Sequence, residues 1–89
     1  MVSVHLDGVF SELVPTRHLT ASSSTLDSIL DELEERYPRL KFRIRDETGA
    51  IRRFIRVFVN GEEVRGPEGL GRTIGATDEV DVLHSVQGG

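Results

Sequence analysis

Two glycines, Gly88 and Gly89, stand last in the sequence and raise the question of whether this end is reactive. Glycine has no Cβ, so a Gly-Gly segment can pass extended through a narrow channel that excludes larger residues. The terminal carboxylate of Gly89 would then be the only functional group that the tail presents to a partner. Once activated as an acyl-adenylate, that group could accept a sulfur nucleophile to give a thiocarboxylate, or an amine to give an amide. The alternative interpretation is a frayed or trimmed end.

No other group in the sequence has the spacing of a catalytic site. Cysteine is absent, which excludes a thiol nucleophile and thiolate metal ligands. His5, His18 and His84 do not have metal-ligand spacing, and the glycines of residues 66–71 match no phosphate-binding motif. We therefore expect the chain to be no enzyme and to bind no metal or cofactor of its own. The ATP and magnesium needed for activation would belong to a partner.

Length and charge restrict the class of protein. The 89 residues suit one domain, spanning residues 1–89, and the net charge of −4 argues against nucleic acid as a partner. No apolar run approaches the roughly 20 residues that span a bilayer, and no signal peptide pattern is present. We expect a cytoplasmic protein that does not engage membranes. Arg52, Arg53 and Arg56 form a basic run, either a solvated strand face or a contact for an acidic partner protein.

One amphipathic helix is predicted within residues 24–38, from the helical spacing of Leu26, Ile29, Leu30, Leu33 and Tyr37. Ser24 is the predicted N-cap, with Asp27 three residues later, and Pro38 ends the helix. The acidic residues on the opposite side are predicted to form a solvated face: Asp31, Glu34 and Glu35.

The strands follow from alternating apolar residues, and we predict them at residues 2–6, about 17–21, 55–59, from 63, and in the last segment 79–86. Asn60-Gly61 predicts a type I′ hairpin turn, and Leu70 and Ile74 should anchor the loop that follows. A single helix must cover one face of a mixed sheet, so the predicted fold class is a two-layer α+β sandwich. We expect the first and last strands to pair and a flexible tail, residues 85–89, to project from a central strand.

A partner that activates Gly89 needs a docking surface on this chain. Phe58 and Leu83 are apolar residues predicted to point outward from neighbouring strands, and we interpret them as docking residues. The alternative is that the loop of residues 8–16 covers them.

The sequence resembles the ubiquitin-like sulfur carrier family, which includes ThiS, MoaD and CysO types. The resemblance covers nearly the whole chain and rests on the order and spacing of short motifs up to Gly-Gly. They are FVNGEEV at residues 58–64, GL at 69–70, DEV at 78–80 and VQGG at 86–89. The segment RFIRVFVNGEEVRGPEGL is most similar to the CysO-type branch, which serves cysteine biosynthesis.

This resemblance implies a β-grasp fold and adenylation of Gly89 by an E1-like enzyme, followed by conversion to a thiocarboxylate. In the CysO branch it further implies that a pyridoxal-phosphate-dependent cysteine synthase takes the sulfur and that a JAMM-type metalloprotease releases the product. The docking patch of the family corresponds to Leu83. Val86 and Gln87 would set the reach of the tail, and Gly88 and Gly89 its passage.

Several destinations for the terminal group stay open. A MoaD-like role in molybdopterin synthesis or a ThiS-like role in thiamine synthesis would use the same tail. His84 and Ser85 stand where relatives often have proline, which bears on the choice of partner. A ubiquitin-like modifier would instead join Gly89 to lysines of other proteins, and with Lys41 as the single lysine it would form few chains. A plain interaction module is the remaining alternative.

Overall fold

A computed structural model of the chain describes residues 1–84. The strands are β1 (Val2–Leu6), β2 (His18–Ala21), β3 (Ile55–Val59), β4 (Glu62–Val64) and β5 (Glu79–His84). The helices are α1 (Leu26–Arg36) and α2 (Gly66–Leu70), with 3₁₀ turns η1 (Gly8–Phe10) and η2 (Pro38–Leu40). The predicted strands and main helix are therefore confirmed as far as residue 84.

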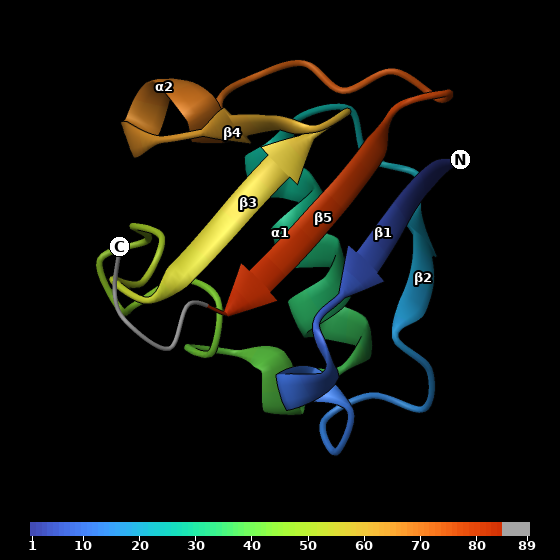
Figure 1. The fold of residues 1–89 in the computed structure, drawn as a ribbon, viewed down its shortest axis with the longest axis vertical. Coiled ribbons are helices and arrows are strands. Elements are labelled where there is room, and N and C mark those ends of the chain that lie inside the picture. Colours follow the sequence, from blue (N-terminus) through green and yellow to red (C-terminus); the bar gives the residue numbers. More distant parts are fainter. Residues whose placement is uncertain (85–89) are drawn as a thin grey trace.

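The strands form one mixed sheet in the order β2-β1-β5-β3-β4. β1 and β5 pair in parallel, and the other neighbours are antiparallel. α1 crosses one face of this sheet (Figure 1). The predicted α+β class, the pairing of first and last strands and the β-grasp arrangement are thus confirmed. β5 is the central strand and pairs with β1 on one side and β3 on the other. The chain beyond His84 therefore starts from a strand that is paired along both edges.

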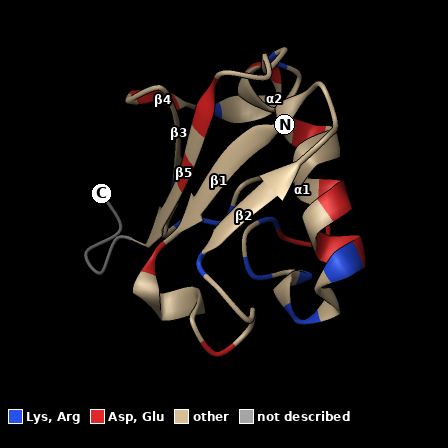
Figure 2. Ribbon diagram, turned by 90° about the vertical axis from the view of Figure 1, so that its right-hand side faces the viewer, with Lys and Arg blue, Asp and Glu red and all other residues tan. Residues whose placement is uncertain are grey.

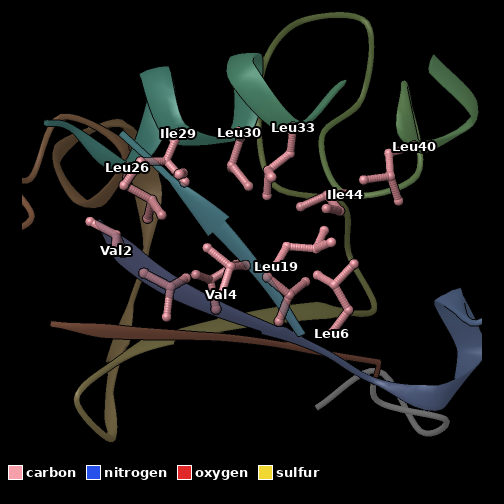
Figure 3. Close-up of a cluster of buried hydrophobic side chains, with 14 of the residues drawn as sticks. Val2, Val4, Leu6, Leu19, Leu26, Ile29, Leu30, Leu33, Leu40 and Ile44 are labelled. Carbon is pink, nitrogen blue, oxygen red and sulfur yellow. The ribbon is translucent and has the colours of Figure 1, made fainter. Parts of the chain in front are cut away.

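The core lies between α1 and the inner face of the sheet (Figure 3). The helix contributes Leu26, Ile29, Leu30 and Leu33, all completely buried. Alternate strand residues face them, as the period of two requires. The completely buried strand residues are Val4, Ala21, Val57, Val59, Val80 and Val82. Removal of these apolar side chains from water is the main term that holds the sheet to the helix.

The N-terminus of α1 differs from the prediction. Thr25, not Ser24, is the N-cap: its hydroxyl accepts from the Ser28 backbone N–H at 3.2 Å, and the Ser28 hydroxyl accepts from the Thr25 N–H at 3.1 Å. The carbonyl of Ser24 instead accepts from the N–H of Ile74 at 2.7 Å, which ties the helix entry to the segment before β5. With its carbonyl in this hydrogen bond, Ser24 lies outside the helix, and the N-cap is one residue later than predicted. The predicted end before Pro38 is correct, since α1 stops at Arg36.

The segment between β3 and β5 follows the sequence closely. Asn60 and Gly61 have φ of 51° and 84°, as a type I′ turn needs. Residues 66–70, expected as part of a loop, form the five-residue helix α2 instead. Leu70 and Ile74 are both buried, as predicted. Gly69 packs tightly against β4, because a Cβ there would lie 3.1 Å from Val64 Cβ.

Candidate functional site

The candidate site begins where β5 ends. The last described residue is His84, and the predicted tail residues Val86, Gln87, Gly88 and Gly89 lie outside the described residues. Figure 1 shows that β5 ends at the same end of the sheet as η1. The geometry around His84 therefore determines where the tail starts.

Asp7 connects the ends of β1 and β5. Its carboxylate accepts a hydrogen bond from the His84 N–H at 3.0 Å and a longer one from the Val9 N–H at 3.4 Å. Its own N–H donates to the Val82 carbonyl at 2.9 Å. The His84 N–H is the main cause of a pKa of Asp7 below its ordinary value, with the Val9 and Gly8 N–H groups adding to it against the effect of partial burial. Asp7 thus fixes the last residue of β5 to the start of η1.

Replacing Asp7 by alanine is expected to lower the free energy of unfolding by about 1 kcal/mol at neutral pH, since charge-assisted contacts to two N–H groups are lost. The lowered pKa gives the sign of the pH dependence. The stabilisation is fully present above the unfolded pKa of about 4 and is lost as the pH falls through the lower folded value. Urea unfolding of both proteins should show the difference between them closing below about pH 4. A difference that stays constant with pH would contradict this role.

Phe58 and Leu83 lie on neighbouring strands, as predicted. In the β3–β5 register Leu83 is opposite Arg56, and Phe58 is opposite Asp81, so all four side chains point to the face of the sheet away from α1. Leu83 is 41% exposed and Phe58 is half-buried. The loop of residues 8–16 directs Phe10 and Val14 into the core and leaves Leu83 accessible. The outer face of β3 and β5 can therefore offer apolar surface beside the end of β5.

The rest of this outer face is polar. His5 and His18 are directly opposed across β1 and β2, with ring centroids 4.1 Å apart, and His5 Nε2 lies 3.7 Å from Glu79 Oε1. Among residues 1–84 no three metal-ligating side chains come close enough together to hold an ion. The described part of the chain likewise contains no helix long and apolar enough to cross a membrane.

A pocket lies beside His84, at the end of β5. We call it the β5-end pocket; its volume is about 370 Å³, and its walls are Val9, Phe10, Leu13, Arg43, Arg52, Arg53, Phe54, Ile55 and His84. The predicted basic run reaches two surface pockets, because Arg52 and Arg53 also line a second one together with Arg56 and Glu63. Arg52 and Arg53 line the β5-end pocket, whereas Arg56 pairs with Glu63 at 3.0 Å on the outer face of the sheet. Arg43, which precedes this run in the same irregular segment, also lines the β5-end pocket, and no pattern in the sequence marked it.

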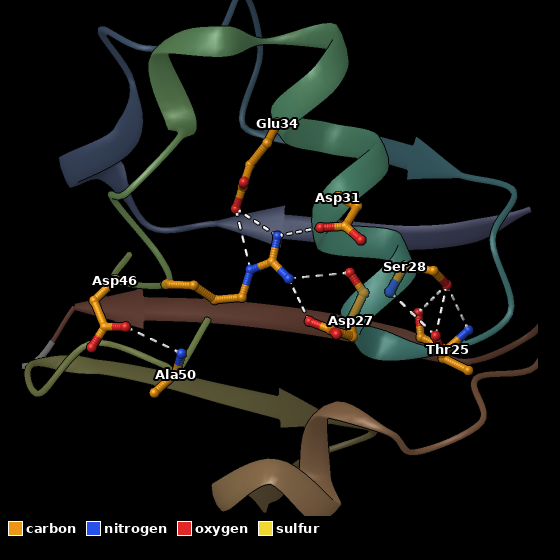
Figure 4. A network of polar contacts seen from close by, with 8 residues as sticks. Thr25, Asp27, Ser28, Asp31, Glu34, Asp46 and Ala50 are labelled. Carbon is orange, nitrogen blue, oxygen red and sulfur yellow. Dashed lines mark hydrogen bonds and ion pairs between the residues drawn. The ribbon is translucent and has the colours of Figure 1, made fainter. Parts of the chain in front are cut away.

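Arg45 is a residue whose role the sequence analysis missed. Its guanidinium contacts three carboxylates of α1: Asp27, Asp31 at 2.7 Å and Glu34 at 2.9 Å (Figure 4). Burial disfavours its charge, but the hydrogen bonds of Asp31 and Glu34 outweigh this and raise the pKa of Arg45, so it stays protonated.

The expectation of a solvated acidic face on α1 is therefore wrong for Glu34. Its side chain is only 13% exposed because it folds over Arg45, while Asp31 stays 68% exposed. Acidic residues line the outer side of α1 in Figure 2. The spacing of Asp27, Asp31 and Glu34 by four and three residues is one stripe of the helix and could have indicated a shared cation. The contact fixes the segment that leads into β3 and the β5-end pocket.

Comparison with known proteins identifies the family. The model of the ThiS family matches residues 4–89. The chain belongs to the ThiS family. Sulfur carrier protein CysO of Mycobacterium tuberculosis is 35% identical to this ThiS-family chain over 75 residues, which cover 82% of the chain and 81% of the relative.

Solved structures agree with this family. CysO in the Amycolatopsis orientalis BexX/CysO complex superposes with a TM-score of 0.88 at 30% identity over all of both chains. Mycobacterium tuberculosis CysO gives 0.87 at 29% identity, covering 97% of this chain and 100% of that one. The small archaeal modifier protein 1 of Methanosarcina acetivorans gives 0.81 at 31% identity, covering 99% and 95%. The predicted resemblance to the sulfur carrier family, and to its CysO-type branch, is confirmed.

Proposed function

We propose that this chain is a sulfur carrier whose Gly89 carboxylate is activated by a partner and converted to a thiocarboxylate. The observation that supports it most is the match to the ThiS family through residue 89, together with the identity to CysO carriers. The position of β5 in the middle of the sheet adds to this, because a central strand gives the tail a rigid starting point.

The proposed chemistry has two steps. A carboxylate oxygen of Gly89 attacks the α-phosphorus of ATP, so a C–O–P linkage forms and pyrophosphate leaves. A sulfur nucleophile then attacks the acyl carbon, the bond to AMP breaks, and a thiocarboxylate results. ATP and magnesium are held by an E1-like adenylyltransferase, whose cations stabilise the leaving phosphates. The chain itself acts as carrier and substrate and has no catalytic group, and the activating step belongs to the cytoplasm, where ATP is supplied.

AMP release tests this step. The full chain, ATP, magnesium and an E1-like enzyme from the same organism should release AMP only when both the chain and a sulfide source are present. AMP release that does not depend on the chain contradicts the proposal.

We further propose cysteine as the destination of the sulfur, supported by the 35% identity to CysO. The acceptor would be a pyridoxal-phosphate-dependent cysteine synthase, and a JAMM-type metalloprotease would release the product from Gly89. Supplying the thiocarboxylate in turn to a cysteine synthase, a thiazole synthase and a molybdopterin synthase large subunit tests this. We expect only the cysteine synthase to consume the thiocarboxylate. Consumption by the thiazole synthase would instead indicate a ThiS-like role, and consumption by the molybdopterin synthase large subunit a MoaD-like role.

Phe58 and Leu83 are the proposed docking residues for the activating enzyme. Leu83→Gln should raise the KM for the chain about tenfold, because an apolar contact at an interface centre often contributes that much. Its exposure predicts an unchanged free energy of unfolding. Thr20→Gln, on the same sheet face at the far strand β2, is the matched control. Equal KM values for both variants would place docking elsewhere.

A second candidate is a protein modifier attached through Gly89. The structural similarity to small archaeal modifier protein 1 favours it. With Lys41 as the single lysine, chains could grow from one side chain at most, so single attachments are expected. Tryptic digestion of a cell extract, followed by a search for residues 73–89 joined through Gly89 to lysine side chains in peptides of other proteins, distinguishes the two. Abundant conjugates would support the modifier role, and their absence would leave the carrier role.

A further inference from the structure

The β5-end pocket combines an apolar floor with a basic rim. Phe10 and Ile55 are buried and form part of the floor. Val9 and Phe54 also line it and are 54% and 43% exposed, which is unusual for large apolar side chains that lie together. The pocket can therefore take an apolar side chain from outside.

Three arginines give the pocket its charge. Arg43, Arg52 and Arg53 line it, and no carboxylate does, although the chain as a whole has a net charge of −4. The Phe42 carbonyl accepts from Arg52 Nη1 at 2.9 Å, and the Arg53 guanidinium lies 5.6 Å from the centre of the Phe54 ring. Both contacts orient the guanidinium groups. Arg52 also acts at longer range on Asp46, whose pKa is lowered mainly by hydrogen bonds from Thr48 and to a smaller degree by the Arg52 charge.

Four of the seven arginines outside the pocket are paired with acids, whereas Arg17, Arg36 and Arg39 form no ion pair within residues 1–84. Arg45, Arg56, Arg65 and Arg72 each contact at least one carboxylate. Within residues 1–84, by contrast, none of the three pocket arginines forms an ion pair. A local excess of positive charge on an acidic protein selects for an acidic ligand at this point of the surface.

We propose that the β5-end pocket binds an acidic protein segment of the activating enzyme, an apolar side chain filling the pocket and carboxylates on either side pairing with Arg43, Arg52 and Arg53. This inference rests on the proposed function. His84 is both a wall of the pocket and the residue from which the tail departs, so the same partner can hold this segment and Gly89. The apolar floor favours a peptide over a nucleotide or nucleic acid, whose phosphates would use the rim alone.

A peptide titration tests the pocket without any enzyme. The ¹⁵N-labelled full chain at low salt is titrated with acetyl-Asp-Glu-Phe-Asp-Glu-amide. Amide shifts are expected at Val9, Phe54 and His84 and not in β2. They should be lost with the Phe of the peptide replaced by alanine, and with the double variant Arg52→Gln, Arg53→Gln. The equally charged control Arg17→Gln, Arg65→Gln should bind as the unmodified chain does. Equal shifts with inorganic phosphate, or with a basic peptide of the same length, overturn the proposal.

Activation kinetics then connect the pocket to the partner. The Arg52→Gln, Arg53→Gln variant should show a KM for the chain about tenfold higher with kcat unchanged, since rim charges act on encounter and binding. The control variant should match the unmodified chain, and high salt should remove the difference. A chain that no activating enzyme turns over contradicts the proposed function. Normal turnover with an unaffected KM contradicts only the pocket.

Discussion

Deletion of Gly89 should reduce AMP release by the activating enzyme by about 100-fold or more, because a 1 Å displacement of a reacting group can already cost that factor. The variant still ends in a carboxylate, now on Gly88. That group stands one residue closer to β5, a retreat of about 3.5 Å for extended chain. The experiment therefore tests the position of the carboxylate and not its presence.

This deletion should leave the stability of the fold unchanged. The sheet and its core are formed by residues 2–84, so the free energy of unfolding should not change. Gln87→Ala is the length-preserving control, and it should retain most of the activity. Addition of one residue after Gly89 should be as damaging as the deletion. A deletion variant with AMP release within twofold of the full chain would contradict the account.

Arg45→Met is expected to lower the free energy of unfolding by about 3 kcal/mol, at the low end for a broken buried ion pair. The lower figure follows from the partners, because Asp27 and Asp31 are 51% and 68% exposed and can be rehydrated. Glu34, at 13% exposed, is the carboxylate left without compensation. Urea unfolding at neutral pH measures the loss through a lower midpoint with an unchanged slope.

Two control variants separate the contributions around Arg45. Asp31→Asn should cost less than about 1 kcal/mol, since this partner is exposed. Arg45→Met combined with Glu34→Leu should recover part of the loss, because no buried charge then stays unpaired. An Arg45→Met variant as stable as the unmodified chain would mean that the network contributes charge neutrality and no stability.

The local elements were predictable because their causes are local. The apolar stripe of α1 and the Asn60-Gly61 turn each depend on residues within one short window. The N-cap of α1 was misassigned by one residue: Thr25 forms the capping box with Ser28, while the Ser24 carbonyl accepts from the N–H of the distant Ile74. Tertiary contacts of this kind leave no mark on sequence spacing.

The candidate site likewise contains residues that could be predicted from the sequence and residues that could not. Gly89 and the apolar pair Phe58 and Leu83 could be proposed from terminal chemistry and strand alternation. Asp7 and Arg45 could not, because each contacts groups outside its own segment: the carboxylates of Arg45 are 11 to 18 residues away, and the contact between Asp7 and His84 spans 77 residues. Arg43 could not, because only the pocket formed by the fold gives it a role. Charged side chains in irregular segments acquire a role only through the surface that the fold brings to them.

The central claim is that Gly89 becomes a thiocarboxylate, and mass spectrometry of the C-terminal peptide tests it most directly. The full chain is incubated with ATP, magnesium, the activating enzyme and a sulfide source, and the peptide after Arg72 is fragmented. The account predicts that one oxygen is replaced by sulfur, located on Gly89 and removed by alkylation and hydrolysis. A peptide of unchanged mass after AMP release, or sulfur located on any other residue, would contradict it.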